Sequence, residues 1–324
     1  MMPQSHLKCW VCISGPSVPP HTMSSDAPNS KFTVDPSTQA SWGAPTRQQP
    51  SNMRGLIQSG KVLLGQVLSY PSRQVAKTLA VTGADWIWID AEHVAWSQKL
   101  LVEAIQIITH ESGGKMIPIV RVPSKTAFDH MAWALDAGAG GVIVPHIETV
   151  EEVAAVAGAC RFPPAGHRSF PPFTFLPGVT DITPKGESVY SLANKHVAII
   201  PQVESRVGIK NIDSIMQMEE VDAVMIGAGD LRLEMGLSVG FVGEEPEFAA
   251  AMNRVTAMSK KYKKSLVGVA ISAPMVEERL KQGFTVLVTT VDFYTLGFAT
   301  ITELGTARAT VEEYLSKANS ESVM

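Results

Sequence analysis

Little in this chain of 324 residues suits an extracellular, membrane-spanning or nucleic-acid-binding protein. It has only three cysteines, too few for a disulfide framework, so we expect a reducing, cytoplasmic compartment. Cys9 and Cys12 have CxxC spacing, but no second pair follows to complete a zinc site. The net charge of −4 gives no basic surface for nucleic acid, and no apolar run reaches the roughly 18 residues that span a bilayer. We therefore expect neither nucleic acid nor a membrane as a partner.

Regular apolar spacing is absent from residues 1–50. This segment is rich in Pro, Ser, Thr, Gln and Asn, a composition that predicts a flexible, disordered N-terminal extension. Residues 51–324 carry the pattern of one large domain. A Gly-x-Gly-x-x-Gly turn is also missing after the first expected strand, which argues against a dinucleotide-binding fold.

Apolar strands and amphipathic helices alternate along residues 61–318. The eight expected strands cover 61–69, 85–90, 116–122, 141–146, 197–203, 221–226, 265–271 and 284–291. Helical sequence follows each of them, at 72–82, 97–111, 127–137, 150–160, 208–218, 246–263, 275–282 and 293–318. This alternation predicts parallel strands, and eight repeats in about 265 residues favour a closed (β/α)8 TIM barrel over an open sheet.

Two stretches depart from this alternation. Residues 162–190 have many Pro, Gly and Phe residues and no period, which is typical of a functional or disordered loop. The last helical stretch is longer than one barrel helix requires, which suits packing on a neighbouring subunit.

Polar side chains follow four of the expected strands. The second strand has period two, because Trp86, Trp88 and Asp90 alternate with Ile87 and Ile89. In a barrel, the carboxyl ends of the strands converge at one mouth, where catalytic groups collect. The polar residues expected at this mouth are Asp90, Glu92 and His93 after the second strand, Arg121 after the third, Gln202 and Glu204 after the fifth, and Asp230 after the sixth.

These residue types predict metal and acid–base chemistry. Glu204 and Asp230 would end adjacent strands, and two neighbouring carboxylates suit Mg²⁺ or a similar hard divalent ion. The alternative is that each pairs with a Lys or Arg. Asp90 would orient His93 for proton transfer, where the alternative is a structural histidine. Arg121 offers a planar fork to a carboxylate or a developing oxyanion, or else forms an ordinary ion pair.

Six segments together resemble one known family. They are 85–93 (Asp-Trp-Ile-Trp-Ile-Asp-Ala-Glu-His), 120–123 (Val-Arg-Val-Pro), 141–145 (Gly-Val-Ile-Val-Pro), 161–168 (Arg-Phe-Pro-Pro-Ala-Gly-His-Arg), 202–204 (Gln-Val-Glu) and 226–231 (Ile-Gly-Ala-Gly-Asp-Leu). In this order and spacing, from Met53 to Gly305, the chain resembles the class II pyruvate aldolases of the HpcH/HpaI type, within the citrate-lyase β-like superfamily. The resemblance implies a barrel of the phosphoenolpyruvate/pyruvate-domain type.

The same resemblance implies roles for the residues at the mouth. Glu204 and Asp230 would ligate a divalent cation, Mg²⁺ first, with Mn²⁺ or Co²⁺ as alternatives. Arg121 would stabilise a pyruvate enolate, the Asp90–His93 pair would move the proton through water, and Gln202 would line the site. The substrate would be a small 2-keto acid. The family forms hexamers with exchanged C-terminal helices, which implies a homo-oligomer here.

The chain departs from the common family pattern at two places, and it also has a group of aromatic residues that resembles one member of the family. It reads Gly227-Ala-Gly-Asp-Leu-Arg232 where the family commonly has Gly-Pro-Ala-Asp-Leu-Ser, and Val94-Ala95 where the family often has Gly-Pro. A group of aromatic and proline residues resembles the substrate-binding wall of a fungal member that decarboxylates oxaloacetate and adds the enolate to a 2-pyrone; ordinary core packing is the alternative. These residues are Trp88, Phe170, Pro172, Phe173 and Tyr190.

The resemblance therefore implies a metal-dependent carbon–carbon lyase that acts through a pyruvate enolate. The reaction would be aldol cleavage of 4-hydroxy-2-keto acids, oxaloacetate decarboxylation, or both, with addition of the enolate to a 2-pyrone or another acceptor as the alternative. A lyase for CoA thioesters would need a basic cluster for the CoA phosphates, and the sequence shows none. A non-catalytic barrel that binds or scaffolds is the alternative from another class, and the complete set of polar strand ends argues against it.

Overall fold

The computed structural model describes residues 52–171 and 183–321. The predicted N-terminal extension, residues 1–50, lies outside the described residues. Two residues of the predicted aromatic wall, Pro172 and Phe173, also lie outside them.

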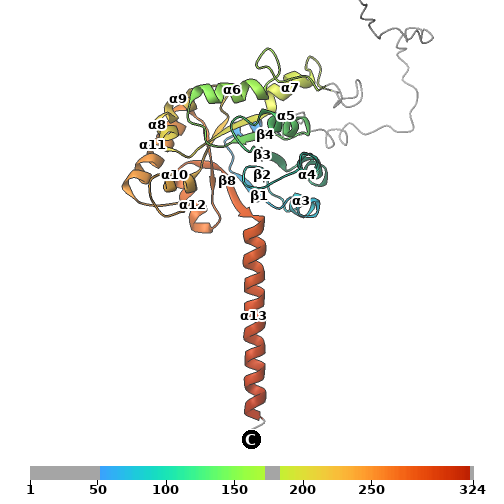
Figure 1. Cartoon of the computed structure of the whole chain (residues 1–324), viewed down its shortest axis with the longest axis vertical. Helices are drawn as coiled ribbons and strands as arrows, with labels where there is room; N and C mark the ends of the chain where they lie inside the picture. The colour runs from blue at the N-terminus through green and yellow to red at the C-terminus, as the bar shows by residue number, and fades with distance from the viewer. Residues whose placement is uncertain (1–51, 172–182, 322–324) are drawn as a thin grey trace, which may run out of the picture.

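Eight parallel strands form a closed barrel in sequence order, so the predicted TIM barrel is confirmed (Figure 1). The first and last strands pair with each other, which closes the sheet. The strands are β1 (Leu63–Leu68), β2 (Trp86–Asp90), β3 (Ile117–Arg121), β4 (Gly141–Val144), β5 (Ala198–Val203), β6 (Ala223–Ile226), β7 (Ser265–Val269) and β8 (Phe284–Val291).

Helices surround the barrel in the expected βα order. They are α2 (Met53–Gln58), α3 (Arg73–Ala80), α4 (Gln98–Glu111), α5 (Phe128–Asp136), α6 (Val150–Cys160), α7 (Val189–His196), α8 (Arg206–Lys210), α9 (Ile212–Gln217), α10 (Ala228–Glu234), α11 (Pro246–Tyr262), α12 (Ala273–Lys281) and α13 (Asp292–Glu321). Among these, α2, α7 and α10 were not expected, and one expected helix is divided into α8 and α9. Each of these helices has at most eight residues, too few for a clear helical period.

The inside of the barrel is filled by every second residue of the strands. Trp86 and Trp88 of β2 meet inward side chains of the other strands, and Met53 and Ile57 of α2 join the same buried cluster. A Cβ on Gly65 would lie 2.3 Å from the Trp86 indole, so glycine is required beside this ring. Because α2 covers the end where the strands begin, the polar ends of the strands collect at the other end.

Buried ion pairs fix the end of the barrel where the strands begin. Asp222, just before β6, accepts from the Ile199 backbone N–H at 2.8 Å and pairs with Arg54 of α2 at 2.6 Å. Arg161, just after α6, donates to the Val197 carbonyl at 2.7 Å. These contacts connect α2, the end of α6 and the starts of β5 and β6.

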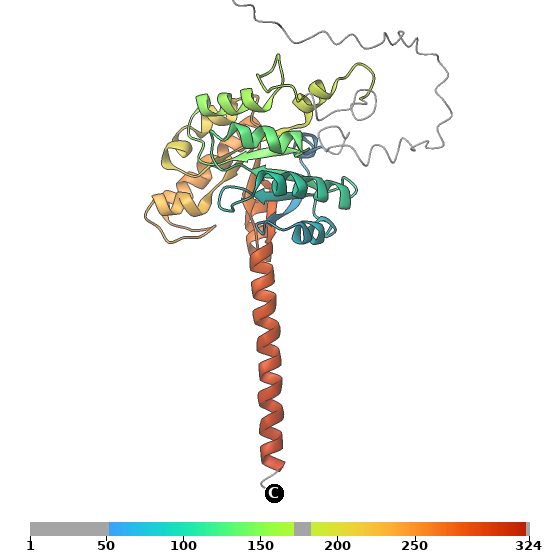
Figure 2. The ribbon, with the colours of Figure 1, turned by 45° about the vertical axis from the view of Figure 1, so that its right-hand side comes forward.

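The last helix, α13, leaves the barrel at the end of β8 and extends away from it (Figures 1 and 2). Asp292 at its start is buried and accepts from Ser69 N–H and Tyr70 N–H at 2.8 and 2.9 Å, which ties the helix to the loop after β1. Beyond that point its apolar side chains are exposed, including Phe298, Ile301 and Leu304. No helix of the described residues is long and apolar enough to cross a membrane.

Candidate active site

The ends of β2 and β3 hold a buried ion pair. Asp90 and Arg121 are partners in the parallel register. The two Asp90 oxygens accept from Arg121 Nε and Nη2 at 2.8 and 2.9 Å, a bidentate geometry. The guanidinium lies over the Trp88 ring, 4.3 Å from its centroid. The structure therefore pairs Asp90 with Arg121, and the sequence-based expectation that Asp90 orients His93 is not supported by these contacts.

Glu92 is a residue of the mouth for which the sequence analysis predicted no role. Its Oε2 lies 2.9 Å from Arg121 Nη1 and 3.6 Å from His93 Nε2. Burial raises the pKa of Glu92, and the nearby Arg121 opposes that shift. The Glu92 backbone N–H donates to Asp90 Oδ1 at 3.2 Å, so the chain turns directly after the strand. The sequence signal for this turn is Asp90 itself, because an aspartate at a strand end can accept the backbone N–H two residues on.

His93 lies at the outer edge of the site. Its side chain is 67 % exposed, and its nearest carboxylate partner in the described chain is Glu92. A small cavity of about 340 Å³ adjoins both residues and extends to Trp96, Pro123 and His130. His93 is therefore placed where it can exchange protons with solvent and with a molecule in this cavity.

Glu204, just after β5, is held in one orientation inside the mouth. Its side chain is 4 % exposed. One carboxylate oxygen accepts from the His146 backbone N–H at 2.8 Å, and the other accepts from the Gln202 side-chain amide. Burial raises the pKa of Glu204, and the negative charges of Asp230 and Glu92 act in the same direction. These hydrogen bonds orient the carboxylate without neutralising its charge.

Asp230 lies in the first turn of α10 rather than on a strand end. Its charge raises the pKa of both Glu204 and Glu92, so it lies within electrostatic reach of both. The mouth thus combines four carboxylates, those of Asp90, Glu92, Glu204 and Asp230, with one guanidinium. Their formal charge is −4 + 1 = −3, an excess that a cation would relieve.

The residues present fit a hard divalent cation. The donors are carboxylate and amide oxygens, the ligands that Mg²⁺ and similar ions prefer. Gln202 Oε1 is buried without a hydrogen-bond partner. A Cβ on Gly227 would lie 2.1 Å from Glu204 Oε2, so only glycine leaves room for this carboxylate. Within the described ranges no three His, Cys, Asp or Glu side chains could hold a metal by themselves, so substrate oxygens and water would complete the ligand set.

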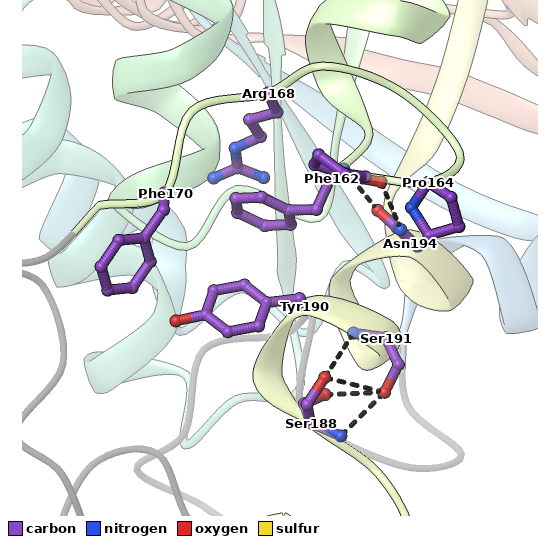
Figure 3. A pocket seen from close by; sticks show the side chains of 9 residues that line it. Phe162, Pro164, Arg168, Phe170, Ser188, Tyr190, Ser191 and Asn194 are labelled. Atoms are coloured by element: carbon purple, nitrogen blue, oxygen red, sulfur yellow. Dashed lines mark hydrogen bonds between the residues drawn. The ribbon is translucent and has the colours of Figure 1, made fainter.

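The predicted aromatic residues Phe170 and Tyr190 lie at the other end of the barrel. Figure 3 shows the two side chains beside Phe162 and Arg168. Their rings meet edge to face with centroids 5.6 Å apart, and they line a cavity of about 690 Å³. This cavity lies between the end of α6 and α7, and the α6–α7 connection joins a helix to the start of the next strand. A single chain therefore does not bring Phe170 and Tyr190 together with Trp88.

Arg232, the residue that departs from the family pattern, points away from the mouth. Its Nη1 and Nη2 donate to the two oxygens of Glu245 at 2.7 and 2.6 Å, and its Nε donates to the Ser238 carbonyl at 2.9 Å. Its guanidinium also lies over Phe248, 4.9 Å from the ring centroid. The arginine thus secures the loop between α10 and α11 and leaves the neighbouring Asp230 free for the site.

A barrel mouth that gathers four carboxylates around a paired arginine suits an enzyme that handles a small anion together with a cation. The model of the HpcH/HpaI aldolase/citrate lyase family matches residues 68–297, and the chain belongs to this family. The protein is accordingly a lyase of the class II aldolase type.

Named relatives support this class. The chain is similar to the 2-keto-3-deoxy-L-rhamnonate aldolase of Klebsiella pneumoniae, with 29 % identity over 74 % of this chain and 86 % of that protein. It is also similar to the 4-hydroxy-2-oxovalerate aldolase of Novosphingobium aromaticivorans, with 32 % identity over 59 % of this chain and 70 % of that protein. Among solved structures, macrophomate synthase matches with a TM-score of 0.78 and 35 % identity, over 84 % of this chain and 95 % of that chain.

The Arg232–Glu245 pair makes part of the stability pH-dependent. Hydrogen bonds from Arg232 lower the pKa of Glu245 from 4.5 to about 2. Because the folded pKa is below the unfolded one, the contribution is complete above pH 4.5 and is lost as the pH falls toward 2. Glu245→Gln should therefore lower the melting temperature at pH 7 and lose this deficit progressively below pH 4.5. Glu244→Gln is the matched control, and equal pH profiles for the two variants would contradict the assignment.

Proposed function

We propose that the protein is a divalent-metal-dependent carbon–carbon lyase that acts on 2-keto acids through a pyruvate enolate. The observation that carries the proposal is the position of Arg121, a buried cation at the same mouth as Glu204 and Asp230. The reactions are aldol cleavage of 4-hydroxy-2-keto acids and decarboxylation of oxaloacetate. The aldolase names of the relatives agree with the first reaction.

Glu204 and Asp230 are the residues that would hold the cation, and the amide oxygen of Gln202, the neighbour of Glu204, is buried without a hydrogen-bond partner. A divalent ion there, Mg²⁺ first with Mn²⁺ or Co²⁺ as alternatives, would supply Lewis-acid polarisation of the keto acid. Gly227 gives Glu204 the room to occupy this position. The Gln202 amide and the His146 N–H keep its two oxygens fixed before substrate arrives.

Arg121 stabilises the negative charge that develops on the enolate oxygen. A guanidinium has five N–H donors, and Asp90 and Glu92 engage only Nε, Nη2 and Nη1 once each. The remaining donors on Nη1 and Nη2 are available to a substrate. Trp88 covers one face of the guanidinium, which limits its solvation and strengthens its interaction with an anion. Asp90 serves as the anchor that keeps this fork in place.

Proton transfer falls to His93 together with Glu92. His93 is exposed beside the small cavity, and Glu92 is its carboxylate neighbour at 3.6 Å. Burial raises the pKa of Glu92, so its carboxyl can hold a proton more readily than an ordinary glutamate. Arg121 engages both acids, but Glu92 is the one that lies near the imidazole, so the geometry favours Glu92 over Asp90 as the partner of the histidine.

Addition of the enolate to a 2-pyrone or another flat acceptor is the second candidate function. The structural similarity to macrophomate synthase, at 35 % identity over 95 % of that chain, favours it. Phe170 and Tyr190 lie at the far end of the barrel, so an acceptor could touch them and Trp88 together only across a boundary between chains. Incubation of oxaloacetate with a 2-pyrone separates the candidates, since simple decarboxylation gives pyruvate and leaves the pyrone unchanged.

A cytoplasmic location forms part of the proposal. Low cysteine content and a free, buried Cys160 suit a reducing compartment. Cell fractionation tests this location, and recovery of the protein outside the cytoplasmic fraction would exclude it.

We also propose that the chain assembles into a homo-oligomer through α13, with a hexamer suggested by the family resemblance. The helix has 30 residues. Leu296, Phe298, Ile301 and Leu304 are each more than half exposed. Helices in water are stabilised mainly by packing an apolar face, and nothing in the described chain packs on this one beyond its first turns. A second copy of the chain supplies that surface.

Charges on this apolar face should break the oligomer. Phe298→Glu combined with Ile301→Glu places two carboxylates on one side of α13, where burial would be strongly unfavourable. Light scattering coupled to gel filtration should show an oligomer for the wild type and a smaller species for the double variant. Thr306→Glu, on a polar position of the same helix, is the control and should retain the wild-type mass. A monomeric wild type would exclude this assembly.

Removal of the space for Glu204 should weaken metal binding. In Gly227→Ala the new Cβ would displace the Glu204 carboxylate, and metal affinity should fall by about 10- to 100-fold, as for other changes that misorient a ligand. Gly229→Ala is the matched control, because no atom beyond its chain neighbours and its own helical backbone lies within 4 Å of its new Cβ. Calorimetric titration with Mn²⁺ measures both. Excess chelator should also abolish oxaloacetate decarboxylation, and full activity in chelator would refute metal dependence.

Arg121 and His93 should have separable effects on the two reactions. Arg121→Ala should lower kcat/KM about 10²- to 10³-fold on oxaloacetate and on a 4-hydroxy-2-keto acid, because both pass through the enolate. His93→Ala should lower aldol cleavage by about 10²- to 10⁴-fold and spare decarboxylation, which needs no base for a hydroxyl proton. Arg121→Lys should restore little, since an ammonium cannot reproduce the planar fork. Equal losses on both substrates for His93→Ala would show that the roles are not divided in this way.

A further inference from the structure

The chain reverses at the end of β4 through a residue in the left-handed backbone region. His146 has φ +55°, and in the described part of the chain Lys263 is the other non-glycine residue with positive φ. Lys263 ends α11, where a left-handed residue is common. His146 lies at the mouth, and a side chain with a Cβ keeps this conformation only where its surroundings hold it.

Three hydrogen bonds hold the backbone around His146. Its N–H donates to Glu204 Oε1 at 2.8 Å, and its carbonyl accepts from Lys125 Nζ at 3.1 Å. The next N–H, that of Ile147, donates to the Gln202 carbonyl at 3.0 Å. Lys125 is itself held by Glu152, 2.5 Å away. Both peptide groups at this turn are therefore fixed: the one before His146 by Glu204, and the one after it by Gln202 of β5 and by Lys125 in the loop after β3.

The imidazole of His146 takes no direct part in this contact. Its Nδ1 lies 3.9 Å from Glu204 Oε1 and its Nε2 lies 3.8 Å from Glu148 Oε1, both beyond hydrogen-bond distance. The side chain is 59 % exposed. His146 therefore contacts the Glu204 carboxylate through its backbone N–H and not through its side chain.

We infer that His146 is a positioning residue for the metal ligand Glu204 and that it acts through its left-handed backbone. In this conformation its N–H fixes one Glu204 oxygen, the Gln202 amide fixes the other, and each oxygen keeps a lone pair for the cation. The inference rests on the proposed function, in which Glu204 binds the metal. Partners that orient a metal ligand change affinity strongly without contacting the metal.

The backbone role gives a substitution series that separates it from a side-chain role. Glycine adopts positive φ without cost and asparagine tolerates it, whereas alanine tolerates it poorly and a β-branched valine least. If the backbone N–H of residue 146 orients Glu204, metal affinity should decrease in this order. If the imidazole orients Glu204, the glycine variant should lose as much metal affinity as the valine variant.

The experiment is calorimetric titration of the full-length chain with Mn²⁺, paired with melting temperatures measured without metal. Wild type, His146→Gly and His146→Asn should agree within about threefold in Kd, and His146→Ala and His146→Val should bind about 10-fold or more weakly. Lys263→Val is the control, because it places a β-branched residue at another position with positive φ, far from the mouth. It should lower the melting temperature and leave Kd unchanged. If His146→Val does not fold, the comparison of alanine with glycine decides.

Three results would overturn the inference. The first is a wild-type Kd for Mn²⁺ in folded His146→Ala and His146→Val. The second is an equal loss of Mn²⁺ affinity in His146→Gly and His146→Val. The third is a loss of Mn²⁺ affinity in Lys263→Val as large as that in His146→Val. Failure of the proposed function looks different. In that case the wild type does not bind Mn²⁺, or Glu204→Gln binds it as tightly as the wild type.

Discussion

The ion pair between Arg121 and Asp90 is the contact on which the rest of the barrel mouth depends. Parallel pairing of β2 and β3 sets the two residues side by side, and Trp88 supports the guanidinium from the core. Without this cation, the buried Asp90 and the partly buried Glu92 would lie beside each other with no compensating charge, and burying unpaired charge costs several kcal/mol per ion. The ends of β2 and β3 can hold two neighbouring acids because Arg121 lies between them and pairs with both.

The two halves of the mouth differ in how their carboxylates are held. At the ends of β2 and β3 the two acids share one cation, whereas the acid after β5 is fixed by an amide, a backbone N–H and a glycine that leaves it room. Hydrogen bonds of that kind set direction but leave the charge in place, and like charges raise the pKa of Glu204 further. The half without a cation of its own suits a metal ion, and the half that holds Arg121 offers a cationic group to an anionic substrate.

Alternation of apolar residues was enough to predict the barrel, and the polar strand ends were enough to predict that Asp90, Arg121, Gln202 and Glu204 share a mouth. Residues beyond the strands were harder to place. Spacing along the chain suggested an Asp90–His93 pair, but the turn at Glu92 directs His93 outward. Phe170 follows α6 and Tyr190 lies in α7, in the connection that leads to the start of β5, so they lie at the end where strands begin. The helix α10 was not predicted because Gly227 and Gly229 flank Ala228 at its start, and glycine has a low intrinsic helix propensity.

The anchoring of α13 has a mechanical consequence. A helix of 30 residues is about 45 Å long, at 1.5 Å per residue. Its base is fixed by Asp292, whose carboxylate also holds the backbone of Ser69 and Tyr70 in the loop after β1. A rotation of about 10° at that base would move the far tip by about 8 Å over this length. A small tilt of the helix at its base therefore becomes a large displacement at its far end. The loop after β1 is coupled to such a tilt, because its backbone is hydrogen-bonded to Asp292.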